Sequence, residues 1–292
     1  MPNAPSIRIF VAAAAAARDS PGLVTTKSGT ALHRGMICAF ALAVLCASFA
    51  PIRADDPLRP GIKGADDRLM VDPVGPPWSS IGRVNRTIGG FCTGVLIAPD
   101  KVLTAAHCLW NARTDRWLQP HSVNFLAGYR QARYIKNAQV QSYVLAPGAE
   151  SMEGKHERNP SADWAVLTLT ESIGHAVGTV PLANFGPERF MADQQKSTIY
   201  IHAGYSQDKA HTLSMHVNCR IKGFAKDNAL VLHDCDATRG DSGAPILAKQ
   251  GDHYEVVALH VATLNAQPVS TGLAVSAGSI LAGLGKAKPP TP

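Results

Sequence analysis

The chain carries the hexapeptide Gly-Asp-Ser-Gly-Ala-Pro at residues 240–245. A glycine two positions before Ser242 lets the backbone turn, so that the N–H groups of Gly240 and Ser242 can point to one spot. A tetrahedral oxyanion needs two such convergent donors, and losing one costs roughly 3–4 kcal/mol of barrier. The pattern alone also fits an inert tight turn, so Ser242 is a candidate nucleophile only together with a base and an orienting carboxylate.

A candidate base and a candidate carboxylate both lie at the ends of strand-like segments. His107 follows the apolar run at residues 102–106, and Asp163 opens the β-type run at residues 164–169. The order His, Asp, Ser is one of the known orders of a catalytic triad. We therefore expect Ser242 to attack a carbonyl, His107 to carry the proton and Asp163 to hold the imidazole.

These three motifs resemble those of the trypsin-like, chymotrypsin-fold serine peptidases, over about residues 66–284. The nearest resemblance is to the bacterial glutamyl-endopeptidase branch, and it rests on Asp66-Asp67-Arg68, residues 77–82, residues 92–97 and Cys235-Asp236. The resemblance implies a serine endopeptidase that cleaves protein or peptide substrates through an acyl-enzyme, with no metal or organic cofactor. It also implies an all-β fold of two six-stranded Greek-key barrels with a short C-terminal helix.

Three other interpretations of these motifs are possible. A catalytically silent binding protein on the same fold usually lacks a triad member, and an esterase of the α/β-hydrolase type conflicts with the strand-rich pattern and the residue order. A zinc site at His107-Cys108, or at His233 and Cys235, lacks a second Cys/His pair at a suitable spacing. The peptidase is therefore the favoured interpretation, and no metal site is expected.

Short β-type runs separated by turn residues predict an all-β organisation. The predicted strands are 94–97, 102–104, 123–127, 164–169, 197–202, 213–219, 229–232, 254–261 and 272–275, and a helix is predicted over 276–284. Within a peptidase domain at 66–285, barrel one would take about 66–180 and barrel two about 181–285. The cleft between them would then join His107 and Asp163 to Ser242.

The first 54 residues are interpreted as an N-terminal extension and a signal peptide with its core at about 36–54. The apolar run at residues 36–47 follows Arg34 and is too short for a comfortable membrane span. Residues 55–65 are expected to be a linker or short propeptide, and residues 286–292 a disordered tail. A secreted or periplasmic location follows from the signal.

The charge of the chain is concentrated in this leader. The whole chain has 28 basic and 22 acidic residues, whereas the part after Ala54 keeps 23 basic and 21 acidic residues, a net charge of +2. This balance gives no support to a nucleic-acid partner or to stable membrane association after signal removal. The mature protein is expected to be a monomer whose partners are its substrates.

Four of the six cysteines remain once Cys38 and Cys46 leave with the signal, and an even number in an exported protein implies disulfides. Three pairings are possible. The resemblance implies a bond between Cys92 and Cys108, which leaves Cys219 with Cys235. In the chain-entropy model each bond contributes roughly 3 kcal/mol.

Two residues compete as the determinant of the cleavage preference. The resemblance to trypsins puts Asp236 at the base of the specificity pocket, which favours cleavage after Arg or Lys, but the Cys-Asp pair also occurs in glutamyl endopeptidases. His260 stands where those enzymes carry a histidine that binds the substrate carboxylate, although a hydrogen-bonded core histidine is an equal alternative.

The segments around His260 depart from the glutamyl-endopeptidase pattern. Ala237 replaces a threonine, and Val261, Ala262 and Thr263 replace the usual residues after the histidine. The backbone of residues 261–263 can still pair with an extended substrate. A preference for acidic residues is the favoured hypothesis.

The acid before the nucleophile, Asp241, raises the question of activation. In zymogen-type relatives it pairs with a newly formed N-terminal ammonium, but the usual Ile-Val-Gly-Gly start is missing here. Cleavage after Arg68 could supply such a terminus. Alternatively, Asp241 binds an internal group.

Overall fold

The structure is a computed structural model of the 292-residue chain, and it describes residues 60–149, 159–264 and 270–290. The chain divides into Met1–Ala50 and Pro51–Pro292, and all described residues belong to the second unit. The predicted signal peptide, and the linker up to residue 59, lie outside the described residues.

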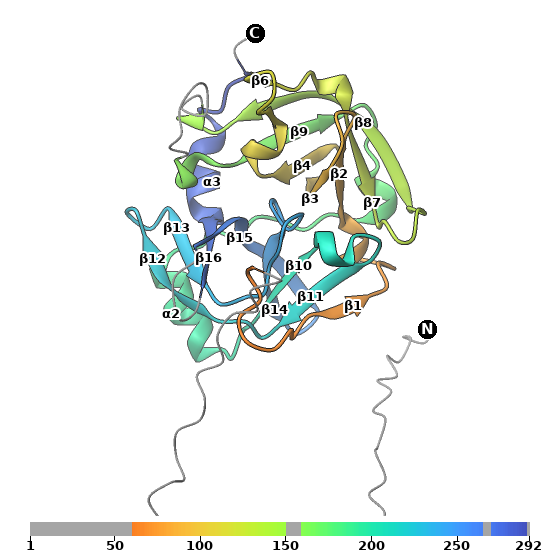
Figure 1. Cartoon of the computed structure of the whole chain (residues 1–292). Helices are drawn as coiled ribbons and strands as arrows, with labels where there is room; N and C mark the ends of the chain where they lie inside the picture. The colour runs from red at the N-terminus through yellow and green to blue at the C-terminus, as the bar shows by residue number, and fades with distance from the viewer. Residues whose placement is uncertain (1–59, 150–158, 265–269, 291–292) are drawn as a thin grey trace, which may run out of the picture. The chain divides into compact units, whose positions relative to one another are not determined.

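Six strands close into an antiparallel barrel, drawn in the upper part of Figure 1. Around the barrel they follow the order β2 (Ile81–Arg86), β3 (Phe91–Ala98), β4 (Lys101–Thr104), β9 (Ala165–Leu169), β8 (Lys136–Leu145) and β7 (Val123–Ala127). Alternate residues of these strands, such as Phe125 and Ala127 in β7, are buried and fill the interior. A separate hairpin pairs β5 (Trp110–Asn111) with β6 (Arg116–Trp117).

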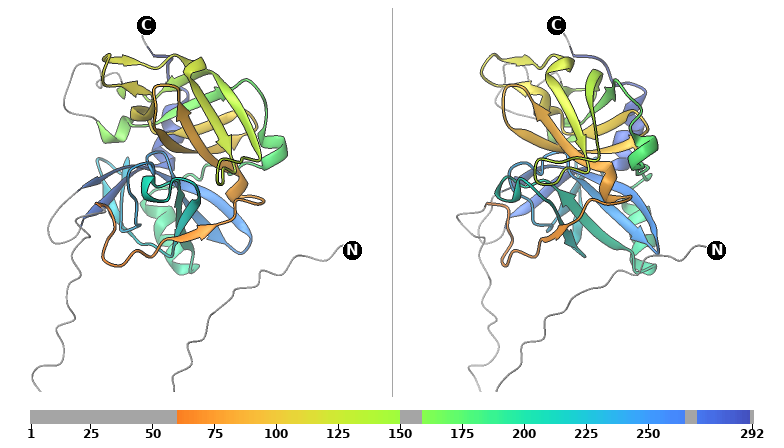
Figure 2. Two further views of the ribbon diagram at one scale, coloured as in Figure 1. Left: turned by 45° about the vertical axis from the view of Figure 1, so that its right-hand side comes forward. Right: turned by 90° about the vertical axis from the view of Figure 1, so that its right-hand side faces the viewer.

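Eight further strands form one antiparallel sheet below the barrel in Figure 1, and both views of Figure 2 keep this arrangement. Their order is β1 (Leu69–Val71), β11 (Leu213–Val217), β10 (Ile199–Gly204), β14 (Pro245–Gln250), β15 (His253–Leu264), β16 (Thr271–Ser276), β13 (Leu230–His233) and β12 (Ile221–Ala225). β1 comes from the N-terminal segment and pairs with β11 at the edge of the sheet. The other seven strands of this sheet all come from the second half of the chain, between Ile199 and Ser276.

The described helices are short: α1 (Gly174–Val177), α2 (Pro187–Gln195) and α3 (Ala277–Leu284). α2 begins with Pro187 after Gly186, a favourable helix start because proline has no N–H to leave unsatisfied. In the described part of the chain no helix has the length and apolar character needed to cross a membrane.

Thr93 of β3 joins the barrel to the second sheet. Its N–H donates to Ser242 O at 2.9 Å, its hydroxyl donates to Gly240 O at 2.9 Å, and the same hydroxyl accepts from Tyr205 N at 2.9 Å. The side chain is fully buried. One barrel residue therefore holds the 240–242 segment against the barrel.

The all-β class, the closed six-stranded barrel and the C-terminal helix are confirmed. The second half differs in detail from a six-stranded barrel, because it is an eight-stranded sheet that includes Leu69–Val71, which the expected boundary assigns to barrel one. The expectation of a disordered tail is wrong for Lys288, which forms an antiparallel bridge with Leu145 through hydrogen bonds of 2.7 and 3.2 Å.

Candidate active site

His107 and Asp163 form a doubly hydrogen-bonded pair. The His107 backbone N–H donates to Asp163 Oδ1 at 2.9 Å, and His107 Nδ1 lies 2.7 Å from Asp163 Oδ2. The Asp163 side chain is almost fully buried, whereas 19% of the His107 side chain is exposed. An ionised carboxylate only accepts, so Nδ1 carries the hydrogen and the exposed ring keeps Nε2 as a proton acceptor.

Strand pairing brings these two residues together across 56 positions of sequence. His107 lies in the 3₁₀ turn Ala106–Leu109 that follows β4, and Asp163 directly follows the turn Pro160–Ala162 before β9. β4 and β9 are neighbours in the barrel, with Thr104 opposite Ala165. The ends of two paired strands therefore present the imidazole and the carboxylate side by side.

The loop that carries Ser242 presses against the end of β4, close to His107. Gly243 has φ +80°, and a Cβ on it would lie 2.3 Å from Thr93 O and 2.8 Å from Ala105 N. Cys108 Sγ lies 3.9 Å from Ser242 O. Only glycine allows this approach, because any side chain at position 243 would collide with barrel backbone.

The predicted oxyanion donors are not engaged by the protein. Within the residues that the structure describes, the N–H groups of Gly240 and Ser242 donate to no protein acceptor, and the Ser242 hydroxyl makes no hydrogen bond, including to the His107 ring. Gly240 has φ +95°, as the sharp turn requires. In substrate-free sites, catalytic hydrogen bonds are often long and tighten only in the Michaelis complex.

Both expected disulfides are present. Cys92 is bonded to Cys108 and Cys219 to Cys235. The first ties β3 to the turn that carries His107, and the second ties the segment after β11 to the segment before Asp236. The cysteine sulfur atoms that the alternative zinc sites need as thiolate ligands are therefore bonded in disulfides.

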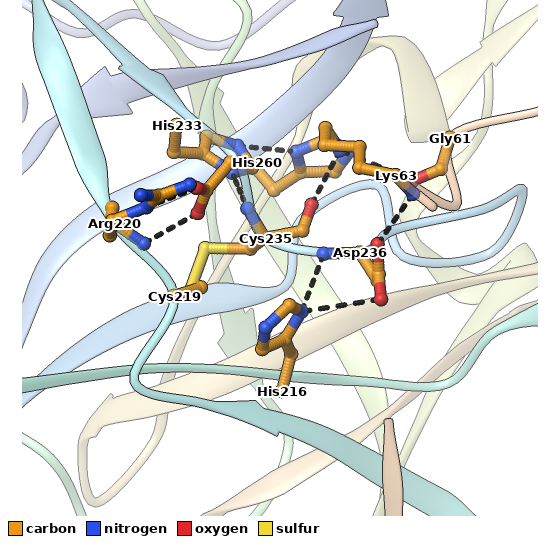
Figure 3. Close-up of a disulfide and its surroundings, with 10 residues drawn as sticks. Gly61, Lys63, His216, Cys219, Arg220, His233, Cys235, Asp236 and His260 are labelled. Carbon is orange, nitrogen blue, oxygen red and sulfur yellow. Dashed lines mark hydrogen bonds and ion pairs between the residues drawn. A yellow bond between two sulfur atoms is a disulfide. The ribbon is translucent and has the colours of Figure 1, made fainter. Parts of the chain in front are cut away.

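The Asp236 carboxylate is turned toward the N-terminal segment and is fully buried. Its Oδ1 accepts from Lys63 N at 2.7 Å, and its Oδ2 lies 3.4 Å from His216 Nδ1 (Figure 3). Oδ2 also accepts from Asp67 N at 3.1 Å. Burial acts to raise the pKa of Asp236, but the contact with His216 and the hydrogen bonds from the N–H groups of Lys63 and Asp67 outweigh it and lower the pKa. The Asp236 carboxylate therefore anchors residues 63–67.

His260 lies at the end of a chain of hydrogen-bonded imidazoles. Cys235 N donates to His233 Nδ1 at 3.2 Å, so the hydrogen of the neutral His233 ring is on Nε2. His233 Nε2 lies 3.1 Å from His260 Nδ1 and donates to it, which in turn puts the His260 hydrogen on Nε2 (Figure 3). The backbone of the disulfide segment therefore sets the tautomer of His260 and makes its Nε2 a donor.

A third imidazole, His202 of β10, packs on this pair. Its ring centroid lies 5.5 Å from that of His260 and 6.4 Å from that of His233. Burial lowers the pKa of His202 and of His233 well below the usual value, and burial followed by the charges of Lys63 and His107 lowers the pKa of His260 to about 3. All three rings are neutral at neutral pH.

Glycine makes room for this histidine cluster (His202, His233 and His260). Gly272 of β16 faces His233 of β13, and a Cβ on Gly272 would lie 2.2 Å from the His233 ring. Any larger residue would displace the ring and break its bond to His260.

The segments expected to contact substrate lie beside the histidine cluster. His260 N donates to Ala244 O at 2.9 Å, and Gly243 N donates to His260 O at 2.8 Å, so β15 fixes the Ser242 loop. A register shift interrupts β15 between His260 and Ala262 where it pairs with β16, and Val261 is buried.

The N-terminal segment is an unexpected part of this region. Ala237 N donates to Gly61 O at 3.2 Å, and a Cβ on Gly61 would lie 2.0 Å from Ala237 O and 3.5 Å from Thr263 Oγ1. Lys63 Nζ donates to Cys235 O at 2.6 Å. Residues 61–63 therefore lie directly against the segment in which Ala237 replaces the expected threonine.

Sequence reasoning missed His202 and Lys63, and it considered His233 only as a zinc ligand. A histidine within an apolar strand was the signal that singled out His260, and the same signal exists at His202 in the run 199–204 and at His233 after the run 229–232. Lys63 carries no comparable signal, because it lies in residues 55–65, which are interpreted as a linker or short propeptide.

Comparison with known proteins supports this description. The family model of trypsin matches residues 74–276, which is more than half of the chain. The glutamyl endopeptidase of Bacillus licheniformis is 25% identical over 184 residues, covering 63% of this chain and 53% of that protein. The chain therefore spans about half the length of this curated relative.

Two solved structures share the fold. A Glu endopeptidase in complex with MPD has a TM-score of 0.59 at 22% identity, covering 75% of this chain and 96% of that one. The protease Anisep from Arthrobacter nicotinovorans has a TM-score of 0.55 at 16% identity, covering 75% and 98%. The resemblance to the trypsin-like serine peptidases and their glutamyl-endopeptidase branch is confirmed, and the chain belongs to the trypsin family.

Proposed function

We propose that this protein is an exported serine endopeptidase that cleaves proteins after acidic residues. The observation that carries the peptidase proposal is the pair of hydrogen bonds from His107 to the two oxygens of Asp163, 2.9 and 2.7 Å long. They orient the ring with Nε2 as the base. The trypsin-family match over residues 74–276 supports the same reaction.

In the proposed reaction Ser242 Oγ attacks the scissile carbonyl carbon while His107 Nε2 takes the hydroxyl proton. The N–H groups of Gly240 and Ser242 stabilise the resulting oxyanion. The C–N bond then breaks as His107 returns the proton to the leaving amine, which leaves an acyl-enzyme on Ser242. Water, deprotonated by His107, hydrolyses the ester and regenerates the hydroxyl.

A fluorophosphonate probe tests the nucleophile. We expect the folded protein to be labelled at Ser242, and labelling to vanish in Ser242→Ala and after unfolding in urea. Ser161→Ala, which changes a serine near Asp163 but outside the proposed reaction, serves as the control and should label normally. A folded wild-type protein that stays unlabelled would favour the silent binding protein.

The acidic preference is supported by the imidazole chain that leaves His260 Nε2 as a donor. A carboxylate is an acceptor only, so it matches this donor, and Lys63 adds a positive charge that acts on His260. The alternative preference for Arg or Lys needs the Asp236 carboxylate, whose two oxygens already accept N–H groups.

Cleavage of a mixed peptide library tests this preference. We expect cleavage mainly after Glu or Asp, and His260→Leu should reduce that preference by about 10- to 100-fold relative to an apolar residue, the effect of losing one charge-assisted hydrogen bond. His216→Leu is the matched control, because His216 contacts Asp236 and not His260. Cleavage confined to sites after Arg or Lys would contradict the proposal.

Export is supported by the two disulfides, which form and persist in oxidising compartments. The signal-like segment around residues 36–54 points the same way. We propose secretion or a periplasmic location, with a monomer as the acting species and protein substrates as its partners.

A further inference from the structure

Arg68 is a buried guanidinium that the proposed reaction does not use. Its Nε and Nη2 donate to the two oxygens of Asp66 at 2.8 and 2.9 Å, and its Nη1 and Nη2 donate to the two oxygens of Asp208 at 3.0 and 2.6 Å. The residue is 6% exposed. Burial acts to lower the pKa of Arg68, but both carboxylates outweigh it and raise the pKa, so the ion cluster is a strong one.

Asp208 extends this cluster to the loop at residues 238–243, which carries Ser242. Thr238 Oγ1 donates to Asp208 Oδ1 at 3.1 Å, and Gln207 N donates to Arg239 O at 2.6 Å. A Cβ on Gly240 would lie 2.4 Å from Tyr205 O and 3.2 Å from Gln207 N. Residues 205–208 are therefore the platform on which the 238–243 loop rests.

Inside that loop Asp241 has neutral partners only. Its Oδ2 accepts from Ser206 Oγ at 2.6 Å and from Thr238 N at 2.7 Å, and Oδ1 has no hydrogen-bond partner among the described residues. Burial raises the pKa of Asp241 to about 6. No lysine or arginine forms an ion pair with it in the described part of the chain, so Thr238 is its link to the cluster around Arg68.

We propose that Arg68 is a positioning residue that holds the 238–243 loop, through Asp208 and Thr238, in the conformation in which Gly240 and Ser242 can act as oxyanion donors. This inference rests on the proposed function and adds the group that organises its active loop. In this proposal Arg68, an internal residue of the N-terminal segment, organises the active loop. A newly formed N-terminal ammonium was the alternative group for that role.

The physical reason lies in the charges at the platform. Without the guanidinium, the Asp208 carboxylate would lose the charged partner that holds it beside Thr238, because Lys209, the other cation of this cluster, is bonded to Asp66. Asp208 is exposed, so water can hydrate its carboxylate once the guanidinium no longer holds it. We expect Asp208 to turn toward solvent, and the 238–243 loop to lose one of its supports.

Thr238→Val and Arg68→Lys test the proposal, with Arg189→Lys as the matched control. Arg189 also bridges two carboxylates, Asp193 and Glu255, at 2.8 and 2.7 Å, but has no link to the 238–243 loop. The measurements are kcat, KM, the rate of fluorophosphonate labelling and the thermal midpoint, all on the purified full chain.

We expect Thr238→Val to lower kcat and the labelling rate about 10-fold with KM within twofold, a fraction of the 10²- to 10³-fold effect of losing one oxyanion donor. Arg68→Lys should lower them further, because lysine cannot bind both carboxylates bidentately. Arg189→Lys should keep wild-type kcat even if its thermal midpoint falls.

Thr238→Val decides the test if Arg68→Lys fails to fold, because it leaves the ion cluster intact. Wild-type kcat in a folded Thr238→Val variant would overturn the positioning role while leaving the proposed function standing. A wild-type protein that neither labels nor cleaves would overturn both.

Discussion

The closed barrel and the eight-stranded sheet both bury ionisable side chains next to the Ser242 loop, but they give them opposite kinds of partner. In the barrel, Asp163 accepts two N–H groups from one histidine. In the sheet, His202, His233 and His260 lie against one another, and burial lowers the pKa of each. The barrel thus holds a carboxylate that orients an imidazole, whereas the sheet holds neutral rings that end in a hydrogen-bond donor.

Burial alone does not determine the role of an ionisable residue. Asp163 and Asp236 are both buried acids that accept N–H groups. The two acids differ in the groups that donate to them. Asp163 accepts from the backbone and the ring of His107, whereas Asp236 accepts from the backbone N–H groups of residues 63–67 and its own N–H donates to the His216 ring. The donors to a buried carboxylate therefore separate a group that orients an imidazole from one that holds a segment in place.

The largest effect is expected at the barrel pair. Asp163→Asn keeps the shape of the side chain but offers an N–H to the histidine, which favours the wrong tautomer of His107. Loss of this orientation should lower kcat by about 10⁴-fold, measured by hydrolysis of a peptide ester. Asp193→Asn, which changes a buried acid bonded to Arg189 and Tyr200, is the control.

This control should lose stability and keep its kcat, because Asp193 lies away from the proposed reaction. A similar kcat for Asp163→Asn and wild type would remove the basis for the different roles of the two regions.

A smaller effect is expected from the histidine cluster as the pH falls. Because the pKa of buried His202 is lowered below its unfolded value of 6.5, the unfolded state binds more protons below that pH, and stability is lost. For one such group the loss is at most about 1.4 kcal/mol for each pH unit below 6.5. His202→Leu should remove this share of the acid sensitivity.

Urea unfolding at pH 7.5 and pH 4.5 measures the effect. His175→Leu, at an exposed histidine of α1, should keep the wild-type difference between the two pH values. If His202→Leu lost as much stability as wild type on acidification, the cluster would not be held as neutral rings.

The smallest effect on cleavage is expected at Asp236. Asp236→Asn removes the carboxylate that holds Lys63 N and Asp67 N, so the free energy of unfolding should fall by about 1–3 kcal/mol. The preference for acidic over basic residues should change by less than about twofold, because the proposed determinant of that preference is His260. A switch of preference in the peptide library would show that Asp236 contacts substrate after all.

Much of the fold could be predicted from local sequence. Runs of β-branched and apolar residues mark β4, β7 and β9, and the predicted 123–127 coincides with β7. β8 was missed because its exposed polar residues dilute the apolar alternation over ten positions, and the register shift between Val140 and Ser142 breaks the period. α2 was missed because its nine residues carry a weak apolar face.

The candidate triad could be named from sequence because each member lies in a short motif whose order is itself informative. The histidine cluster could not, since His202, His233 and His260 come from strands that only the sheet brings together. Lys63 and Arg68 belong to a segment without any strong pattern beyond Asp66-Asp67-Arg68.

By itself the sequence determined the all-β class, the trypsin-like motifs, the cysteine pairs consistent with them and the residues able to do acyl-transfer chemistry. Only the tertiary structure decided which partners surround each buried polar group. The reason is physical: the protonation, tautomer and availability of a side chain depend on its partners, and each of Asp236, His260 and Arg68 has a partner between 27 and 173 positions away.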